Sequence, residues 1–267
     1  MEYRNYSMVQ YGAIAAVVCL IGLGAGGCRS CPKGKEQAGM GVMEAVYAGG
    51  LVTVDGKLDE DVWKDARVYA MELSRDKAGD GTVLQEGGKV RLAWDERFLY
   101  VGFELIDSDV VAEGTADQLH HYTLGDVGEV FLKPEGYSWY WELYVTPAGR
   151  MSTFWFPGRG RLGLRSCFDA HHFDLKVAAS CNGSINKWED KDLGWTGEMA
   201  VPVSELTARG EKFGPGAAWT ILVARYNYSR YLKDTGPENS MTPGLSKTNY
   251  HLLEDYAQLV LLGPTSR

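Results

Sequence analysis

Hydrophobic and polar residues alternate with a period of two along most of the chain between about residues 45 and 262. In residues 139–146 (WYWELYVT), every second side chain is apolar, and these side chains share one face, whereas two tyrosines, a glutamate and a threonine share the other. This alternation, interrupted by Gly, Pro and Asp turns, predicts strands at residues 89–94, 98–105, 129–133, 139–146, 151–156, 175–179, 195–201, 219–228 and 257–262.

Helical periodicity is nearly absent, and only residues 60–66 and 204–206 suggest short helices. Within residues 54–66 (VDGKLDEDVWKDA), we expect a turn at Asp55-Gly56, a helix cap at Asp59 and an inward-facing Trp63 that plugs one end of the fold. Many short strands with close turns predict an all-β fold. The expected architecture is an antiparallel β-sandwich, jelly-roll-like, that forms a single domain over residues 45–263.

The first 28 residues have the features of an export signal. Residues 12–23 (GAIAAVVCLIGL) form an apolar run that is too short to span a bilayer, Arg4 precedes it, and small residues lead to Cys28. Small residues followed by Cys resemble the lipobox of bacterial lipoproteins, which predicts lipidation of Cys28; the alternative is a plain signal peptide cleaved nearby. Residues 29–44 are polar and Gly-rich and predict a flexible tether. We therefore expect an exported lipoprotein of the cell envelope, in the outer membrane, the periplasm or at the cell surface.

Charge and cysteine content narrow the expected chemistry further. The net charge is −8 with no basic stripe, so nucleic acid is not an expected partner. Among the five cysteines, Cys167 and Cys181 form the candidate disulfide, because an oxidising compartment favours such a bond and neither residue has a C-x-x-C neighbour.

Six segments, in order, resemble carbohydrate-binding modules of family 9 and their free-standing bacterial relatives. They are VDGKLDEDVWKDA, VRLAWDERFLYVGFEL, GDVGEVFL, WELYVTPAGRM, GWTGEMAVP and TNYHLLEDYAQLVLL, and together they cover about residues 46–262. The resemblance implies a β-sandwich that binds a sugar ring between two aromatic side chains and clamps it with hydrogen bonds. It also implies structural calcium in some members, for which the acid-rich loops at residues 107–109 and 189–192 are candidates, although the metal ligands stay unassigned.

The resemblance places ligand contacts at six positions, which are Glu129, Tyr144, Arg225, Asn227, Tyr250 and Tyr122. Glu129 falls on the family's clamp glutamate, and Tyr144 stands where the family has an arginine. Tyr250 falls on one of the sandwiching tryptophans, and Tyr122 lies next to the position of the other. An arginine fork beside a carboxylate is a good hydroxyl clamp, so Glu129 and Arg225 are the leading candidates. The alternative for each charged residue is an internal salt bridge.

No arrangement of residues favours catalysis. A glycosidase needs two carboxyls across an open cleft, and nothing singles out Glu129 and Glu142 for that role. The expected function is therefore binding of a polysaccharide or oligosaccharide without cleavage. Two alternatives stay open. One is a haem-binding, electron-transfer sandwich of the related DOMON type, with axial ligands among Met151, Met199, His120 and His251; the other is a structural envelope module whose site has decayed.

Overall fold

Strands dominate the computed structural model, which describes residues 41–169, 173–233 and 236–264. The all-β prediction is confirmed, and all nine predicted strands are present with ends within one or two residues, except that β8 ends three residues further along. The strands are β1 (Val42–Tyr47), β2 (Tyr69–Ala70), β3 (Gly88–Trp94), β4 (Phe98–Leu105), β5 (Val127–Pro134), β6 (Tyr140–Val145), β7 (Met151–Phe156), β8 (Lys176–Asn182), β9 (Gly194–Pro202), β10 (Trp219–Asn227), β11 (Glu238–Thr242) and β12 (Ala257–Leu261).

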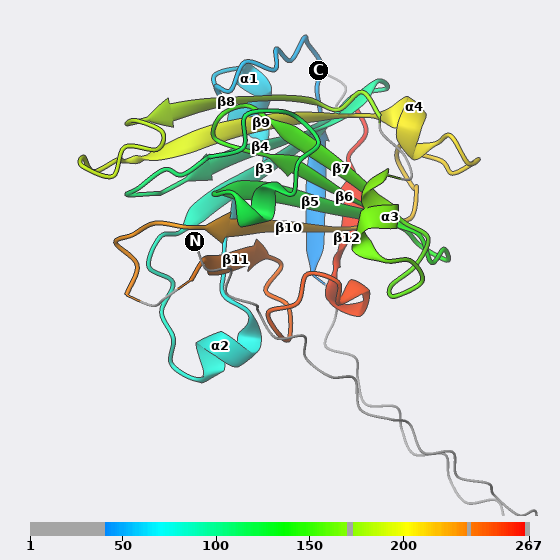
Figure 1. The fold of residues 1–267 in the computed structure, drawn as a ribbon. Helices are drawn as coiled ribbons and strands as arrows, with labels where there is room; N and C mark the ends of the chain where they lie inside the picture. Colours follow the sequence, from blue (N-terminus) through cyan, green and yellow to red (C-terminus); the bar gives the residue numbers. More distant parts are fainter. Residues whose placement is uncertain (1–40, 170–172, 234–235, 265–267) are drawn as a thin grey trace, which may run out of the picture. The chain divides into compact units, whose positions relative to one another are not determined.

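The strands form two layers that β1 joins, in the order β7-β6-β5-β10-β12-β1-β3-β4-β9-β8 (Figure 1). The first half of β1 pairs with β12, and its last two residues pair with β3. Both pairings of β1 are parallel, which departs from the expected antiparallel arrangement; the other strand pairings of the path are antiparallel. Because β1 begins at Val42, the last three residues of the predicted tether belong to the sheet.

Three apolar clusters follow from the alternation of side chains. The first core lies between the layers and takes its side chains from both, including Trp141 and Trp219 of one layer and Val101 and Met199 of the other. The second cluster covers the outer face of β5, β6, β7 and β10 and is mainly aromatic. The third cluster, which includes Trp63, covers the outer face of the β3–β4–β9 layer. Each sheet layer is thus buried on both faces.

Short helices lie in the connections between strands. Helix α1 (Asp61–Asp65) buries Trp63, so the predicted core plug is confirmed, but the capping residue is Glu60 and Asp59 does not cap. The turn predicted at 204–206 is α4 (Val203–Leu206). The sequence pattern did not predict α2 (Arg75–Gly79), α3 (Leu164–Asp169), η1 (His121–Thr123) or η2 (Leu253–Asp255). Among the described residues, no helix has the length and apolar character needed to cross a membrane.

The predicted Cys167–Cys181 disulfide is not formed, because both thiols are free. Cys167 lies on α3 and is buried in the second cluster, whereas Cys181 lies on β8 in the other layer and packs against the first core. The two residues therefore lie on opposite sides of a sheet layer. The predicted export signal, the lipidation site at Cys28 and residues 29–40 of the predicted tether lie outside the described residues.

Candidate functional site

Two glutamates and a tyrosine share the outer face of β5 and β6. Glu129 of β5 lies directly opposite Tyr144 of β6, and Phe131 lies opposite Glu142. Because directly opposed residues of neighbouring strands point to the same side of a sheet, Glu129, Tyr144 and Glu142 all enter the second cluster. Ala224 of β10 is the opposite neighbour of Glu129, and its small side chain leaves room above the carboxyl group.

Tyrosines surround the two carboxyl groups. We call Tyr122, Tyr140, Tyr144, Tyr226, Tyr250 and Tyr256 the tyrosine cluster; all six belong to or pack against the second cluster. Four of them are buried, whereas Tyr122 and Tyr226 are half-buried. The rings of Tyr122 and Tyr226 lie 6.0 Å apart with an interplanar angle of 47°. These two rings are therefore the most exposed members of the tyrosine cluster.

The carboxyl group of Glu129 has no hydrogen-bond partner for either oxygen among the described residues, although only 1% of the residue is exposed. Burial therefore raises the pKa of Glu129 well above its usual value, and the neighbouring Glu142 raises it further, while the adjacent Tyr144 hydroxyl lowers it in part. Buried polar groups in folded proteins are nearly always hydrogen-bonded. Glu129 is thus an unusual feature that a bound ligand could explain.

Glu142 is also buried but has one partner. Its Oε1 accepts a hydrogen bond from the Tyr144 hydroxyl, while its Oε2 has none and lies 4.0 Å from Nε2 of His251. Burial raises the pKa of Glu142 to about 7. His251 in turn shares a hydrogen bond of 2.9 Å with the Tyr140 hydroxyl, and burial lowers the pKa of its imidazole. Near neutral pH the site therefore carries little positive charge.

Arg225 and Asn227 do not join this site, which corrects the predicted clamp. Arg225 lies opposite Gly128, one position away from Glu129, so its side chain points to the inner face of the layer. There its Nη2 donates to Asp107 Oδ2 at 3.0 Å, and both side chains are fully buried. Asn227 donates to Glu86 Oε2 at 2.8 Å on the same inner face. The internal salt bridge, which the sequence left as an alternative, is the observed role of Arg225.

Tyr250 belongs to the tyrosine cluster but is not an open stacking platform. Only 6% of the residue is exposed, and its hydroxyl donates to the backbone oxygens of Arg225 at 2.7 Å and Ser240 at 3.3 Å. Its ring packs edge-on against Tyr226 at 5.6 Å. Tyr226 was missed in the sequence, although alternation in RYNYS already places it on the face opposite Arg225. The structure makes Tyr226, with Tyr122, the accessible aromatic surface of the site.

The structure does not identify calcium ligands in the acid-rich loops. Buried carboxylates gather near Arg225, but their oxygens already accept hydrogen bonds from backbone amides. Asp126 accepts from Val111 and Tyr228, and Asp192 accepts from Val110 and Ser184. In the part of the chain that the structure describes, no group of three or more His, Cys, Asp or Glu residues could hold a metal ion. We therefore assign no residue to calcium.

The candidate haem ligands lie in separate clusters. Met199 is buried in the first core, and Met151 packs against that core. His120 stacks on Phe168, and His251 contacts Tyr140, so both histidines belong to the second cluster. A sheet layer lies between the methionines and the histidines, so none of these pairs faces one common space.

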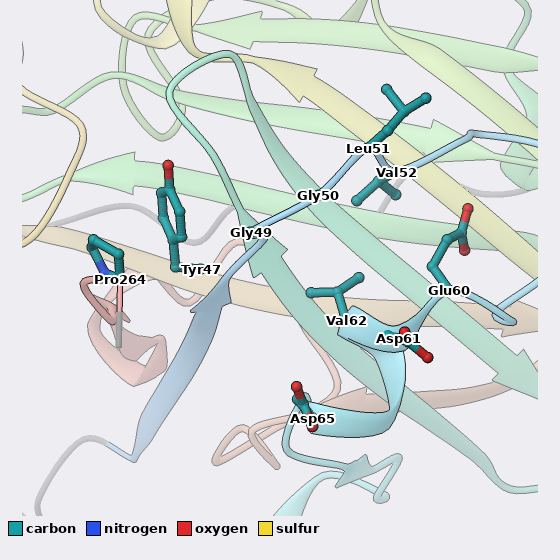
Figure 2. A pocket seen from close by; sticks show the side chains of 10 residues that line it. All are labelled: Tyr47, Gly49, Gly50, Leu51, Val52, Glu60, Asp61, Val62, Asp65 and Pro264. Carbon is teal, nitrogen blue, oxygen red and sulfur yellow. The ribbon is translucent and has the colours of Figure 1, made fainter. Parts of the chain in front are cut away.

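A separate surface hollow of about 620 Å³ lies between the end of β1 and α1. Figure 2 shows Tyr47 and Pro264 on one side, Val62 and the carboxylates of α1 on the other, and two glycines along the floor; the lining is Tyr47, Gly49, Gly50, Leu51, Val52, Glu60, Asp61, Val62, Asp65 and Pro264. Several polar groups here already have partners, since Tyr47 donates to Glu96 and Asp61 pairs with Lys64. None of the predicted contacts lies in this hollow.

Comparison with known proteins shows similarity of structure only. No family model and no curated protein matches the sequence. A protein from Bacteroides uniformis, provisionally described as carbohydrate-binding, superposes with a TM-score of 0.59 at 15% identity, over 83% of this chain and 99% of that one. Family 9 carbohydrate-binding modules from Caldicellulosiruptor kristjanssonii give TM-scores of 0.54 and 0.55 at 13% identity. The module in complex with cellotriose is matched over 84% of this chain and 95% of its own, and the module in complex with glucose over 85% and 98%. The predicted resemblance is confirmed at the level of the fold.

Proposed function

We propose that the protein binds a saccharide on the outer face of β5, β6 and β10 and does not cleave it. Glu129 would lie at the floor of the site, and Tyr122 and Tyr226 would contact the sugar from above. We further propose that the chain is exported and attached to the membrane through a lipid on Cys28. The structural likeness to modules that bind cellotriose and glucose supports the class of ligand.

The observation that carries the proposal is the unpartnered carboxyl group of Glu129 beneath half-buried tyrosine rings. A sugar has hydroxyl groups that can pair with such a carboxyl and C–H groups that can stack on a tyrosine face. The two kinds of group lie on the same face of the sheet here, as saccharide binding requires. Glu129 is buried in the described conformation, so we expect the neighbouring, half-buried Tyr122 and Tyr226 to turn aside when a ligand enters.

Replacement of Tyr226 by Ala tests this placement. Loss of a stacking ring is worth about 1–3 kcal/mol for planar ligands, so we expect at least a roughly fivefold weaker affinity for the saccharide. The measurement is isothermal titration calorimetry of the full chain with glucose, cellotriose and xylotriose. The matched control is Tyr137→Ala, because Tyr137 is 49% exposed and lies outside the second cluster.

The control variant is expected to bind like the wild type. Equal saccharide affinity of the Tyr226→Ala and Tyr137→Ala variants would contradict the placement of the site on this face of the sheet. Absence of binding to these three sugars and also to the glucosamine trimer discussed below would reject the proposed function itself.

A further inference from the structure

The pair Glu129 and Glu142 is buried without any cation beside it. Glu129 is 1% exposed and Glu142 is 5% exposed, and three of their four carboxyl oxygens lack a hydrogen-bond partner. No Lys or Arg of the described chain forms an ion pair with either group; the nearest basic atom is Nε2 of His251, 4.0 Å from Glu142. A buried carboxylate without a countercharge is strongly disfavoured, so protonation rather than a cation neutralises the pair in the free protein, and three oxygens still lack a hydrogen-bond partner.

Among the described residues, the titratable groups that pack against the pair carry no positive charge near pH 7. They are the hydroxyls of the tyrosine cluster, the thiol of Cys167 on α3 and the imidazole of His251. Arg159 approaches from the rim, but it donates to the backbone oxygen of His251 and pairs with Glu254. None of these described groups therefore supplies a positive charge to the pair.

Two other buried carboxyl groups, those of Asp107 and Glu198, have the partners that Glu129 lacks. Asp107 pairs with Arg225 at 3.0 Å. Glu198, on the outer face of the other layer, accepts hydrogen bonds from the amides of Asp55 and Gly56 and from the indole of Trp63. The contrast indicates that a bound ligand supplies the hydrogen-bond donors that Glu129 and Glu142 lack.

We propose that the ligand of this site is an amino sugar, whose ammonium group binds between Glu129 and Glu142. The inference rests on the proposed saccharide function and names its ligand class. An ammonium group brings three N–H donors and one positive charge, which match three unpartnered oxygens and an uncompensated pair of acids. A hydroxyl or an acetamide supplies a hydrogen bond but no charge, and a uronic acid would add a third like charge.

Proton release is a direct consequence of this arrangement. In the free protein, burial holds the pKa of Glu142 at about 7 and that of Glu129 well above its usual value, so protons occupy the pair near neutral pH. An adjacent ammonium group favours the charged carboxylates, so binding lowers both pKa values and expels protons. A neutral saccharide leaves the protonation of the pair largely unchanged.

Calorimetry with three trisaccharides of equal length tests the inference. The ligands are the glucosamine trimer, its N-acetylated counterpart and cellotriose, each titrated near neutral pH into the full chain in two buffers of different ionisation enthalpy. We expect the glucosamine trimer to bind at least about tenfold more tightly than either neutral ligand, a difference of about 1.4 kcal/mol. We also expect a buffer-dependent enthalpy, and hence proton release, for that ligand alone.

Two further results would separate the inference from the proposed function. If cellotriose or the acetylated trimer binds as tightly as the amine, the amino-sugar inference is wrong while saccharide binding stands. If none of the three ligands binds, the proposed function and the inference fail together.

Matched glutamine variants locate the effect. Glu129→Gln keeps the shape and the neutral state of the side chain, so the fold should persist, and a thermal melt checks that it does. We expect this variant to lose both the preference for the amine and the proton release. Glu198→Gln is the control, because Glu198 is equally buried but lies in the other layer. Retention of the tenfold preference in Glu129→Gln would overturn the assignment.

Discussion

Replacement of Arg225 by Ala is expected to lower the free energy of unfolding by about 3–5 kcal/mol, because removal of one partner of a buried ion pair leaves the other charge uncompensated. Arg225 and Asp107 are both fully buried, with Nη2 and Oδ2 3.0 Å apart. The guanidinium also donates to the backbone oxygen of Glu86 at 3.0 Å. Urea denaturation followed by tryptophan fluorescence measures the loss.

The control for this experiment is Arg165→Ala. Arg165 also forms an ion pair, with Asp169 at 3.6 Å, but its side chain is 93% exposed. Exposed pairs of this kind contribute at most about 1 kcal/mol. Equal stability of the two variants would contradict the buried position of Arg225. If Arg225 were instead a ligand contact, its loss would weaken binding and leave stability nearly intact.

We also expect a large effect of pH: the free energy of unfolding should decrease as pH rises from about 5 to about 8. The pKa of Glu142 and that of Glu198 are each raised by burial from 4.5 to about 7. Between these values the folded state binds more protons than the unfolded state, so the free energy of unfolding falls with pH. The contribution is complete below about pH 4.5 and is lost as pH rises through about 7, with up to about 3 kcal/mol for each group.

Glu129 acts in the same direction, because its pKa is also raised. His121 and His251 oppose the trend, since burial lowers the pKa of each imidazole and stability is lost as pH falls below about 6.5. Three glutamates outweigh two histidines in this window. Urea denaturation across the pH range tests the trend, and the double variant Glu142→Gln, Glu198→Gln should flatten it. A wild-type protein that becomes more stable towards pH 8 would contradict the neutral, buried state of these glutamates.

Alternation predicted nine of the twelve strands that the described residues form, because residues such as Leu143 and Trp141 must enter a core at every second position. The strand pairing could not be predicted in the same way. The parallel pairings of β1 join it to β12, which is distant in sequence, and to β3. Strands β1, β2 and β11 were not predicted, and β2 has only two residues. Periodicity describes a strand and not its neighbours.

The candidate site illustrates the same limit at the level of single residues. The sequence analysis grouped Glu129 and Tyr144, and the pairing of β5 with β6 places them directly opposite each other. The resemblance grouped Arg225 with Glu129. Arg225 instead pairs with Gly128, one position away, and a difference of one residue places its side chain on the other face of the sheet. Burial of Tyr250 was also unpredictable, since it depends on the segment that folds back onto the second cluster.

Tyr144 connects the resemblance with the chemistry of the site. It stands where the resemblance leads us to expect an arginine, and its neutral hydroxyl donates to Glu142 in place of a cation. The face therefore has acids and tyrosines but no fixed positive charge. This difference explains why we expect the ligand preference to differ from that of modules in complex with glucose or cellotriose.

Hydrogen exchange followed by mass spectrometry, with and without the tightest-binding trisaccharide, tests most directly that a saccharide binds on the tyrosine face. We predict slower exchange in residues 119–131, 222–228 and 249–256, which contribute Tyr122, Glu129, Tyr226 and Tyr250. Residues 182–193, which carry the exposed Trp188, should be unaffected. Protection confined to residues 182–193, with unchanged exchange around Glu129, would contradict the account.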